Sequence, residues 1–365
     1  MRRRHSVDKT FLGISLVLLV GGYFIFTSAS FGLLLKDGGI FTNTALTQLA
    51  AIALGLVLCY VASRIPLSFI REYAWLWLTL GAVLMALVFV PGLGVAYGGA
   101  ERWLSVFGIS LQPGEFLKLS LVVALAAWLT RRGAEKDTQR KKTFWVFSVL
   151  LAGAGALFLS QPDTDSFAIV LAAGVSLYAV AGFPLKHLLT LGATALVLAV
   201  FLFSARPYLL ERLTVFLNPD RDPLGAGYQL QQSLIAVGSG GITGKGFGKS
   251  VQKFNRLPEP TNDSIFAVFA EEFGLIGSGI LVLLFAALAL RGLRIAARSP
   301  DMFARLIATG CTVLISGAAF LNFASMLGLA PLSGLALPFI SHGGSAMLGT
   351  LIGVGLILNV SRHGV

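Results

Sequence analysis

The sequence predicts an all-α polytopic membrane protein with about ten transmembrane helices and one large extracytoplasmic loop between spans 7 and 8. Three observations predict this class. Only 12% of the 365 residues are charged and 56% are hydrophobic, whereas about a quarter of an ordinary soluble domain is charged. Apolar runs of about 20 residues, the length that crosses a bilayer as a helix, recur along the chain. A single long polar segment, residues 204–272, interrupts them.

Ten apolar windows give the expected helices. The first follows a basic N-terminus, as in a signal peptide, but it lacks a clear small-residue cleavage site and equally apolar segments follow, so we interpret it as the first span. We treat residues 1–365 as one integral membrane domain with a long outer loop at about 205–264. The windows cover residues 11–31, 45–64, 73–91, 114–130, 143–160, 166–182, 187–204, 265–290, 303–326 and 342–361.

The distribution of Lys and Arg determines the expected orientation, because cytoplasmic loops of membrane proteins are enriched in these residues. With the N-terminus inside, the cytoplasmic loops collect most of them, whereas the short outer loops hold only Lys36 and Arg102. This asymmetry explains the net charge of +11 better than nucleic-acid binding does. Both termini are therefore expected in the cytoplasm. Most acidic residues fall on the outer side, which predicts a polar site there.

The string QPGEFLK places two charges at the start of the fourth expected span. Glu115 falls in the first helical turn, where an acid complements the helix dipole. Lys118 follows three residues later on the same face. Two interpretations remain open: an ion pair that positions the helix, or a lysine turned inward to bind a phosphate.

The string QPDTDSF places Asp163 and Asp165 where Pro162 breaks a helix. Two acids on one turn can ligate a divalent cation through oxygen. They can equally cap the following helix. The cap would come from Asp165 or Ser166. For Asp165 we favour this capping role, and for Asp163 we favour a functional role.

The long polar segment carries the strongest candidates. Glu259 lies between two prolines, and Asp263 precedes an apolar run. Asp263 either caps the helix or, partly desolvated, acts as a general base. Glu271 and Glu272 are costly within a span and are expected to pair with Lys or Arg. Lys245, in a glycine-rich stretch, is expected to attract an anionic lipid or a diphosphate.

The string ALPFISHGGSAMLG breaks the last span before it begins. Pro338 interrupts helical backbone at membrane depth, which is tolerated only beside protein or a cavity. We expect Asn322, in the preceding span, to hydrogen-bond this irregular backbone.

These strings resemble the SEDS family of membrane proteins, which includes FtsW, RodA and SpoVE. The resemblance runs from the first span to the C-terminus and rests on QPGEFLK, QPDTDS, NPDRDPLGAGYQLQQSLIAVGSGGITGKGFGKS, LPEPTNDSIF and LPFISHGGS, in this order. It implies a ten-span peptidoglycan glycosyltransferase that polymerises lipid II at the outer face of the bacterial cytoplasmic (inner) membrane. It also implies a partner, a class B penicillin-binding protein, which is a transpeptidase. The stretch SVQKFNRLPE looks closer to the FtsW type than to the RodA type.

The resemblance also implies roles for individual residues. Asp263 matches the family's essential acid before the eighth span, Glu115 and Lys118 match its QPSE-x-x-K motif, and Asp163 matches its QPD motif. The chain departs from the family where it reads TNDSIF instead of HTDFIF and SHGG instead of SYGG. Both departures keep the acid.

The expected reaction is a single inverting displacement. Asp263 takes the proton of a sugar 4-hydroxyl, and cations stabilise the departing diphosphate. A divalent cation, Mg or Mn, could share that role, although the sequence shows no dedicated ligand set. Apolar grooves between helices would hold the polyprenyl tails. The expected catalytic residue is Asp263, and the expected substrate-binding residues are Glu115, Lys118, Asp163, Arg212, Arg221, Lys245 and Glu259.

Two alternative functions stay open. A lipid II flippase would use the same intramembrane polar residues as a pathway, and it predicts charges spread through the bilayer depth, whereas here the acids crowd one face. A non-catalytic scaffold for a penicillin-binding protein would tolerate Asp263→Asn.

Overall fold

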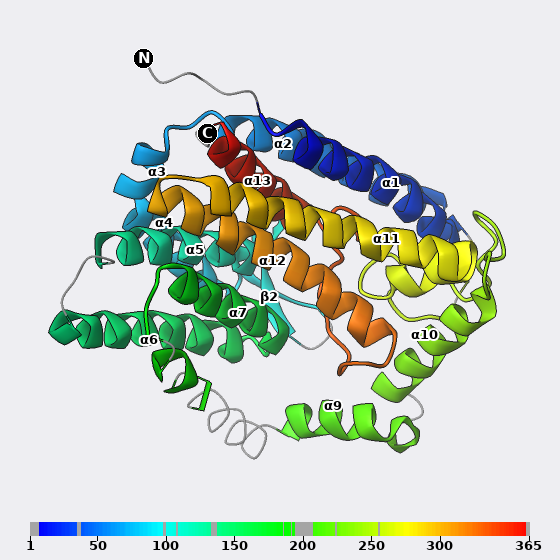
Figure 1. The fold of residues 1–365 in the computed structure, drawn as a ribbon. Helices are drawn as coiled ribbons and strands as arrows, with labels where there is room; N and C mark the ends of the chain where they lie inside the picture. Colours follow the sequence, from blue (N-terminus) through cyan, green and yellow to red (C-terminus); the bar gives the residue numbers. More distant parts are fainter. Residues whose placement is uncertain are drawn as a thin grey trace.

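The computed structural model shows long helices packed side by side, with a small sheet against them (Figure 1). The described residues are 7–34, 38–97, 100–106, 109–132, 137–184, 186–190, 192–193, 207–222, 225–254 and 256–362. The elements are α1 (Lys9–Leu34), α2 (Gly38–Ala62), α3 (Leu67–Glu72), α4 (Ala74–Leu87), β1 (Gly94–Tyr97), β2 (Ala100–Val106), β3 (Ile109–Leu111), α5 (Pro113–Arg132), α6 (Asp137–Ser160), α7 (Thr164–Val180), α9 (Pro207–Leu217), η1 (Pro219–Arg221), α10 (Ala226–Gly240), α11 (Ile265–Arg298), α12 (Met302–Met326) and α13 (Gly344–Ser361).

Seven helices of the described chain are long and apolar enough to cross a membrane, and α4 and α7 are shorter apolar helices. They differ in how much protein surrounds them. In α5 and α12, 78% of the most apolar stretch is buried, against 22% in α2 and α11. On these outer helices large apolar side chains such as Val57 and Leu283 remain exposed. In a membrane protein such an apolar surface faces lipid tails. A helix tolerates this contact because its backbone hydrogen bonds are satisfied within the helix.

The helices agree with the sequence for nine of the ten predicted windows, which overlap α1, α2, α4, α5, α6, α7, α11, α12 and α13. The tenth window, 187–204, lies largely outside the described residues. The two ends of the described chain lie together, since the amide of Asp8 donates to Ser361 Oγ at 3.1 Å. Arg291, near the end of α11, pairs with the Asp8 carboxylate at 2.8 Å. Chain ends on one side of the bundle agree with an even number of spans.

Two parts of the fold were not predicted. A three-stranded antiparallel sheet, β1-β2-β3, precedes α5, so the chain is not helical throughout. The long segment 205–264, which we expected to be a loop, contains α9, η1 and α10. In Figure 1, α10 lies beside the end of α11. These elements are too short or too polar to stand out as membrane spans.

The predicted span 265–290 is wrong in its first part, because α11 doubles back on itself. Gly274 has φ +64° and ψ −163°, which are not helical values and which glycine adopts without steric cost. The ring of Phe323 lies 4.7 Å from that of Phe266 and 5.5 Å from that of Phe285. In a straight helix, Phe266 and Phe285 would be about 28 Å apart and could not both contact Phe323. Residues 265–273 must therefore fold back beside the long part of α11. We call residues 265–273 the half-helix.

Candidate active site

Asp263 lies in the turn just before the half-helix, and three other segments hold this turn. The side-chain amide of Asn322, in α12, donates to the backbone carbonyls of Asp263 and Leu335, both at 2.9 Å. This confirms that Asn322 supports the irregular backbone before the last span. From α10, the Gln229 amide donates to Ser264 Oγ at 3.0 Å. The turn is therefore fixed by groups far apart in the sequence.

The segment before α13 closes the other side of this turn. Ser341 Oγ donates to the carbonyl of Asn262 at 2.7 Å, and the amide of His342 donates to that of Thr261 at 2.8 Å. With its backbone held on both sides, the position of the Asp263 side chain is well defined. Such support from packing and hydrogen bonds is what a precise functional site requires.

Charged side chains surround the half-buried carboxylate of Asp263. The pKa of Asp263 is raised to about 7: burial is the largest cause, the negative charges of Glu259 and Asp165 add to it, and Arg102 and Arg212 oppose it. Within the described residues, no donor makes a hydrogen bond to this carboxylate. A carboxylate with a pKa near neutrality and free lone pairs is suited to accept a proton.

Gly334 lies between the charges. Its amide donates to the carboxylate of Asp165 at 3.0 Å. A Cβ at Gly334 would lie 3.7 Å from Asp263 Oδ2 and 3.9 Å from Arg102 Nη1. Gly334 is itself exposed. The acid and the arginine therefore meet at an opening beside this glycine.

The acids of the QPD string have exchanged the roles that we expected. Asp163, not Asp165 or Ser166, is the N-cap of α7, and its carboxylate accepts from the Ser166 amide at 3.2 Å. Asp165 instead pairs with Arg212 of α9 at 3.2 Å. The N-cap is the residue just before the first helical turn, and α7 begins at Thr164, two residues earlier than a cap at Asp165 requires. Asp165 thus belongs to the group around Asp263.

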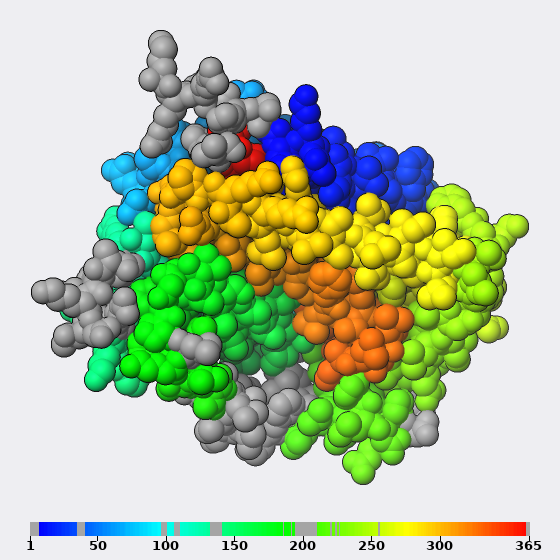
Figure 2. Space-filling view, viewed as in Figure 1, coloured from blue at the N-terminus to red at the C-terminus, as the bar shows by residue number. Residues whose placement is uncertain are grey.

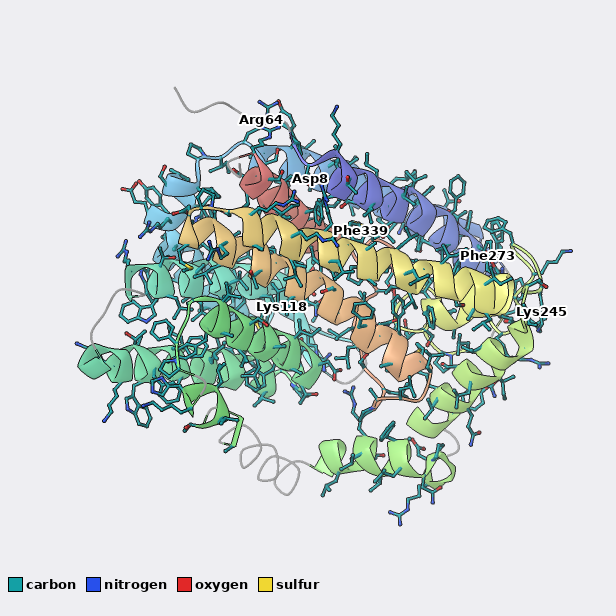
Figure 3. The ribbon with its side chains drawn as sticks, in the orientation of Figure 1. Asp8, Arg64, Lys118, Lys245, Phe273 and Phe339 are labelled. Atoms are coloured by element: carbon teal, nitrogen blue, oxygen red, sulfur yellow. The ribbon has the colours of Figure 1, made fainter. Side chains whose placement is uncertain are left out.

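Glu115 and Lys118 form the ion pair that we considered, at 2.7 Å, with little of either side chain exposed. They border a cavity of about 50 Å³ that is also lined by Leu335, Pro338 and Gly349. Figure 3 shows Lys118 inside the helix bundle. The charge of Lys118 is therefore already compensated by its neighbour.

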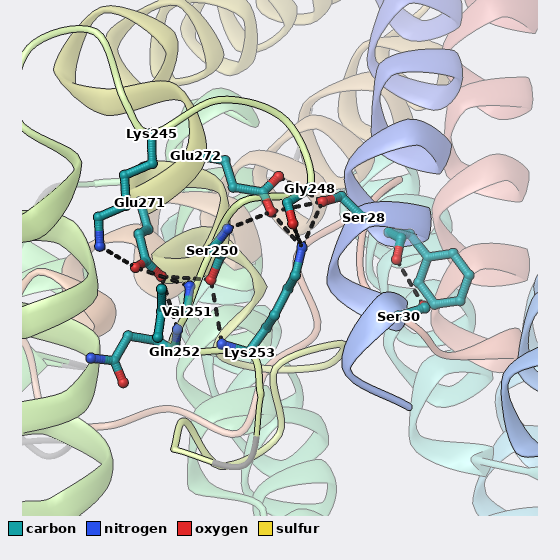
Figure 4. Close-up of polar contacts among 11 residues, drawn as sticks. Ser28, Ser30, Lys245, Gly248, Ser250, Val251, Gln252, Lys253, Glu271 and Glu272 are labelled. Carbon is teal, nitrogen blue, oxygen red and sulfur yellow. Dashed lines mark hydrogen bonds and ion pairs between the residues drawn. The ribbon is translucent and has the colours of Figure 1, made fainter. Parts of the chain in front are cut away.

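The C-terminal end of the half-helix carries a second group of charges, in which Glu271, Glu272 and Lys253 are buried and Lys245 is partly exposed (Figure 4). Lys245 contacts Glu271 at 2.6 Å, and Lys253 contacts Glu272 at 2.7 Å. Glu271 also accepts hydrogen bonds from Ser250 Oγ and from backbone amides of this loop. The expected pairing of both glutamates with cations is thus confirmed. The charge of Lys245 is thus shared with Glu271, while its side chain stays 35% exposed, and its attraction for a diphosphate stays a prediction.

Two further predicted site residues are Glu259 and Arg221. Glu259 has a left-handed backbone, φ +47°, and accepts from the Asn262 amide at 2.6 Å, close enough to Asp263 to influence its charge. Arg221 ends η1 and is exposed. Among the described residues, no group of three or more His, Cys, Asp or Glu side chains is arranged to hold a metal ion. The residue that we missed is Arg102, whose only signal was its isolation in a short outer loop.

An apolar groove of about 520 Å³ runs between α1 and α11. Figure 2 shows these two helices side by side at the surface, in blue and in yellow. Its lining includes Phe247, Phe269 and Phe273, and a Cβ at Gly21, which also lines the groove, would meet no atom within 4 Å. A groove of this composition accommodates a hydrocarbon chain.

These features define a class of protein: a multi-pass membrane protein with a half-buried acid, flanked by arginines, at one end of the bundle. Residues 9–364 match the cell cycle proteins of the FtsW, RodA and SpoVE family. The chain belongs to this family.

Relatives and solved structures agree. Stage V sporulation protein E of Bacillus subtilis is 35% identical, over 99% of this chain and 98% of the relative. The probable peptidoglycan glycosyltransferase FtsW of Thioalkalivibrio sulfidiphilus is 40% identical, over 97% and 89%. A chain from a peptidoglycan synthase complex that coordinates polymerization and crosslinking superposes with a TM-score of 0.78 at 28% identity, covering 98% of both chains. The rod shape determining protein RodA of Thermus thermophilus superposes with a TM-score of 0.72 at 26% identity, covering 98% of this chain and 97% of the RodA chain.

Proposed function

We propose that this chain is a peptidoglycan glycosyltransferase that polymerises lipid II into glycan strands, in cell division or cell elongation. The observation that carries the proposal is Asp263, a half-buried acid whose pKa is raised to about 7 and whose carboxylate is free to accept a proton. The relatives named as peptidoglycan glycosyltransferases give the substrate class.

The reaction is a single displacement with inversion. Asp263 accepts the proton of the 4-hydroxyl of an incoming lipid II. The hydroxyl oxygen forms a bond to the anomeric carbon of the glycan chain that is linked to polyprenyl diphosphate. The bond from that carbon to the diphosphate oxygen breaks, and its electron pair leaves with the diphosphate. The acid returns the proton to solvent, and the glycan has grown by one disaccharide.

Negative charge develops on the departing diphosphate, and fixed cations stabilise it. Arg212 is near the acid but shares its charge with Asp165. Lys118 would have to give up Glu115 before it could reach the substrate. A Mg or Mn ion is part of the proposal only as a substrate-bound ion, since Mg²⁺ is often held by one or two carboxylates together with substrate phosphates.

We place the reaction at the outer face of the bacterial cytoplasmic membrane, where the acidic side of the chain is expected. The polyprenyl tail lies in an apolar groove, for which the surface between α1 and α11 is the candidate. The partner is a class B penicillin-binding protein, supported by the fold's similarity to a chain of a synthase complex.

Polymerisation of purified lipid II by the full-length chain, with and without its partner, tests the proposal. Wild type should give glycan ladders that Asp263→Asn abolishes, whereas Glu211→Gln, which changes an exposed acid of α9, should leave them intact. Ladders of equal strength from Asp263→Asn would move catalysis to another acid. Failure of the wild type even with its partner would favour a flippase or a scaffold.

A further inference from the structure

Arg102 occupies an irregular position in the small sheet. Val95 pairs with Trp103 and Ala96 pairs with Glu101, so Arg102 is the extra residue of β2 at a break in the register. An extra residue of this kind, a β-bulge, redirects a side chain and is common next to active sites. The sheet is therefore built to aim Arg102 out of the regular strand pattern.

Two backbone carbonyls fix the guanidinium group. Arg102 Nε donates to the carbonyl of Gln161 at 2.9 Å, and Nη2 donates to that of Pro162. The Gln161 side chain is in turn held by the carbonyl of Met85, at 3.1 Å. Within the described residues, Nη1 makes no hydrogen bond. The group is thus oriented on one edge and available on the other.

The available edge faces the acid across a gap. Arg102 Nη1 and Asp263 Oδ2 both lie within 4 Å of the point where a Cβ at Gly334 would be. The two groups nonetheless form no ion pair within 4.0 Å among the described residues. A cation and a carboxylate that face each other without contact leave room for substrate oxygen atoms between them.

We propose that Arg102 binds the diphosphate of the polyprenyl-linked donor through Nη1, in the gap beside Gly334. This inference rests on the proposed function and identifies the cation that it requires. Three other candidate cations are engaged: Arg212 with Asp165, Lys118 with Glu115 and Lys245 with Glu271. Arginine suits the role because its planar donors match phosphate oxygens and it remains charged throughout.

Binding of undecaprenyl diphosphate, which carries no sugar, to the detergent-solubilised full chain measures this contact separately from catalysis. Arg102→Gln should weaken binding at least tenfold, and Arg102→Lys should recover part of the loss. Arg294→Gln, at an exposed arginine of α11, is the matched control and should bind as wild type does. Undecaprenyl monophosphate should respond less to Arg102→Gln, because it offers fewer oxygens to the guanidinium.

A second variant probes the gap without removing a charge. Gly334→Ala meets no atom closer than 3.7 Å, so the chain should fold, but its methyl group occupies the space that the diphosphate needs. It should weaken diphosphate binding, whereas Gly317→Ala, with the same clearance beside Ile169 in the bundle, should not.

Wild-type affinity in a folded Arg102→Gln would overturn the proposal and leave Arg102 as a support for the backbone at residues 161–162. If Arg102→Gln does not fold, Arg102→Lys and Gly334→Ala decide, and wild-type binding by both overturns it. The two proposals can fail separately. If diphosphate binding depends on Arg102 but the wild-type chain makes no glycan, the proposed function is refuted and the role of Arg102 in binding stands.

Discussion

The pH dependence of polymerisation tests the role of Asp263 quantitatively. With a pKa of about 7, the ionised fraction of this acid rises from roughly a tenth at pH 6 to roughly nine-tenths at pH 8, so the rate should increase about tenfold. A carboxyl group at the usual value of 3.8 would be ionised throughout this range, and the rate would stay flat. The size of the rise therefore reports how strongly the site perturbs the acid.

The direction of the pKa shift of Asp263 can be tested with Glu259→Gln. Burial raises the pKa of Asp263, the charges of Glu259 and Asp165 add to this effect, and Arg102 and Arg212 oppose it. Removing the Glu259 charge should lower the pKa, so the acidic limb should move to lower pH. The variant should then lose less activity than wild type between pH 8 and pH 6.

The assay is the initial rate of glycan formation at saturating lipid II and constant ionic strength, with thermal unfolding checked at each pH. Glu211→Gln, an exposed acid of α9, should keep the wild-type profile. A flat wild-type profile between pH 6 and pH 8, or a limb that moves to higher pH in Glu259→Gln, would refute the reasoning.

Three further predictions concern stability, the lipid tail and the metal. Glu272→Gln leaves the fully buried Lys253 ammonium without its carboxylate and should cost about 3–5 kcal/mol of unfolding free energy; adding Lys253→Met should recover most of it in thermal unfolding, and an unchanged single variant would contradict the pairing. Gly21→Leu fills open space in the apolar groove and should raise the KM for long-chain lipid II several-fold, whereas Gly13→Leu, equally unobstructed on the same helix, should not; equal KM values would move the tail elsewhere. Chelation should slow polymerisation and Mg²⁺ should restore it, and a rate indifferent to chelator would remove the cation from the mechanism.

Much of the fold could be predicted because its causes are local. An apolar run of about 20 residues specifies a span wherever it occurs, so nine windows match helices. The pairing of Glu271 and Glu272 with cations followed in the same way, since a buried charge requires a partner. However, the composition of an apolar run does not show whether the chain continues straight or reverses within it. The run 265–290 is apolar apart from Glu271 and Glu272, yet only the structure shows, through the backbone at Gly274 and the ring contacts of Phe323, that the chain reverses there.

The site itself depended on contacts between distant segments. Asp263 could be singled out from its position before an apolar run, but its partners come from β2, α7, α9 and the segment after α12. Lys118 and Lys245 looked like available cations, and the structure pairs both with glutamates.

The sequence by itself determined a membrane protein with an acid just before a largely apolar run, because hydropathy and helix-start chemistry act over a few neighbouring residues. Only the tertiary structure decided which cation faces that acid. Arg102 is about 160 positions away along the chain, and a bulge in a short sheet, two carbonyl hydrogen bonds and the missing side chain of Gly334 bring it opposite Asp263. Electrostatic interactions depend on distance in space, and that distance is set by packing.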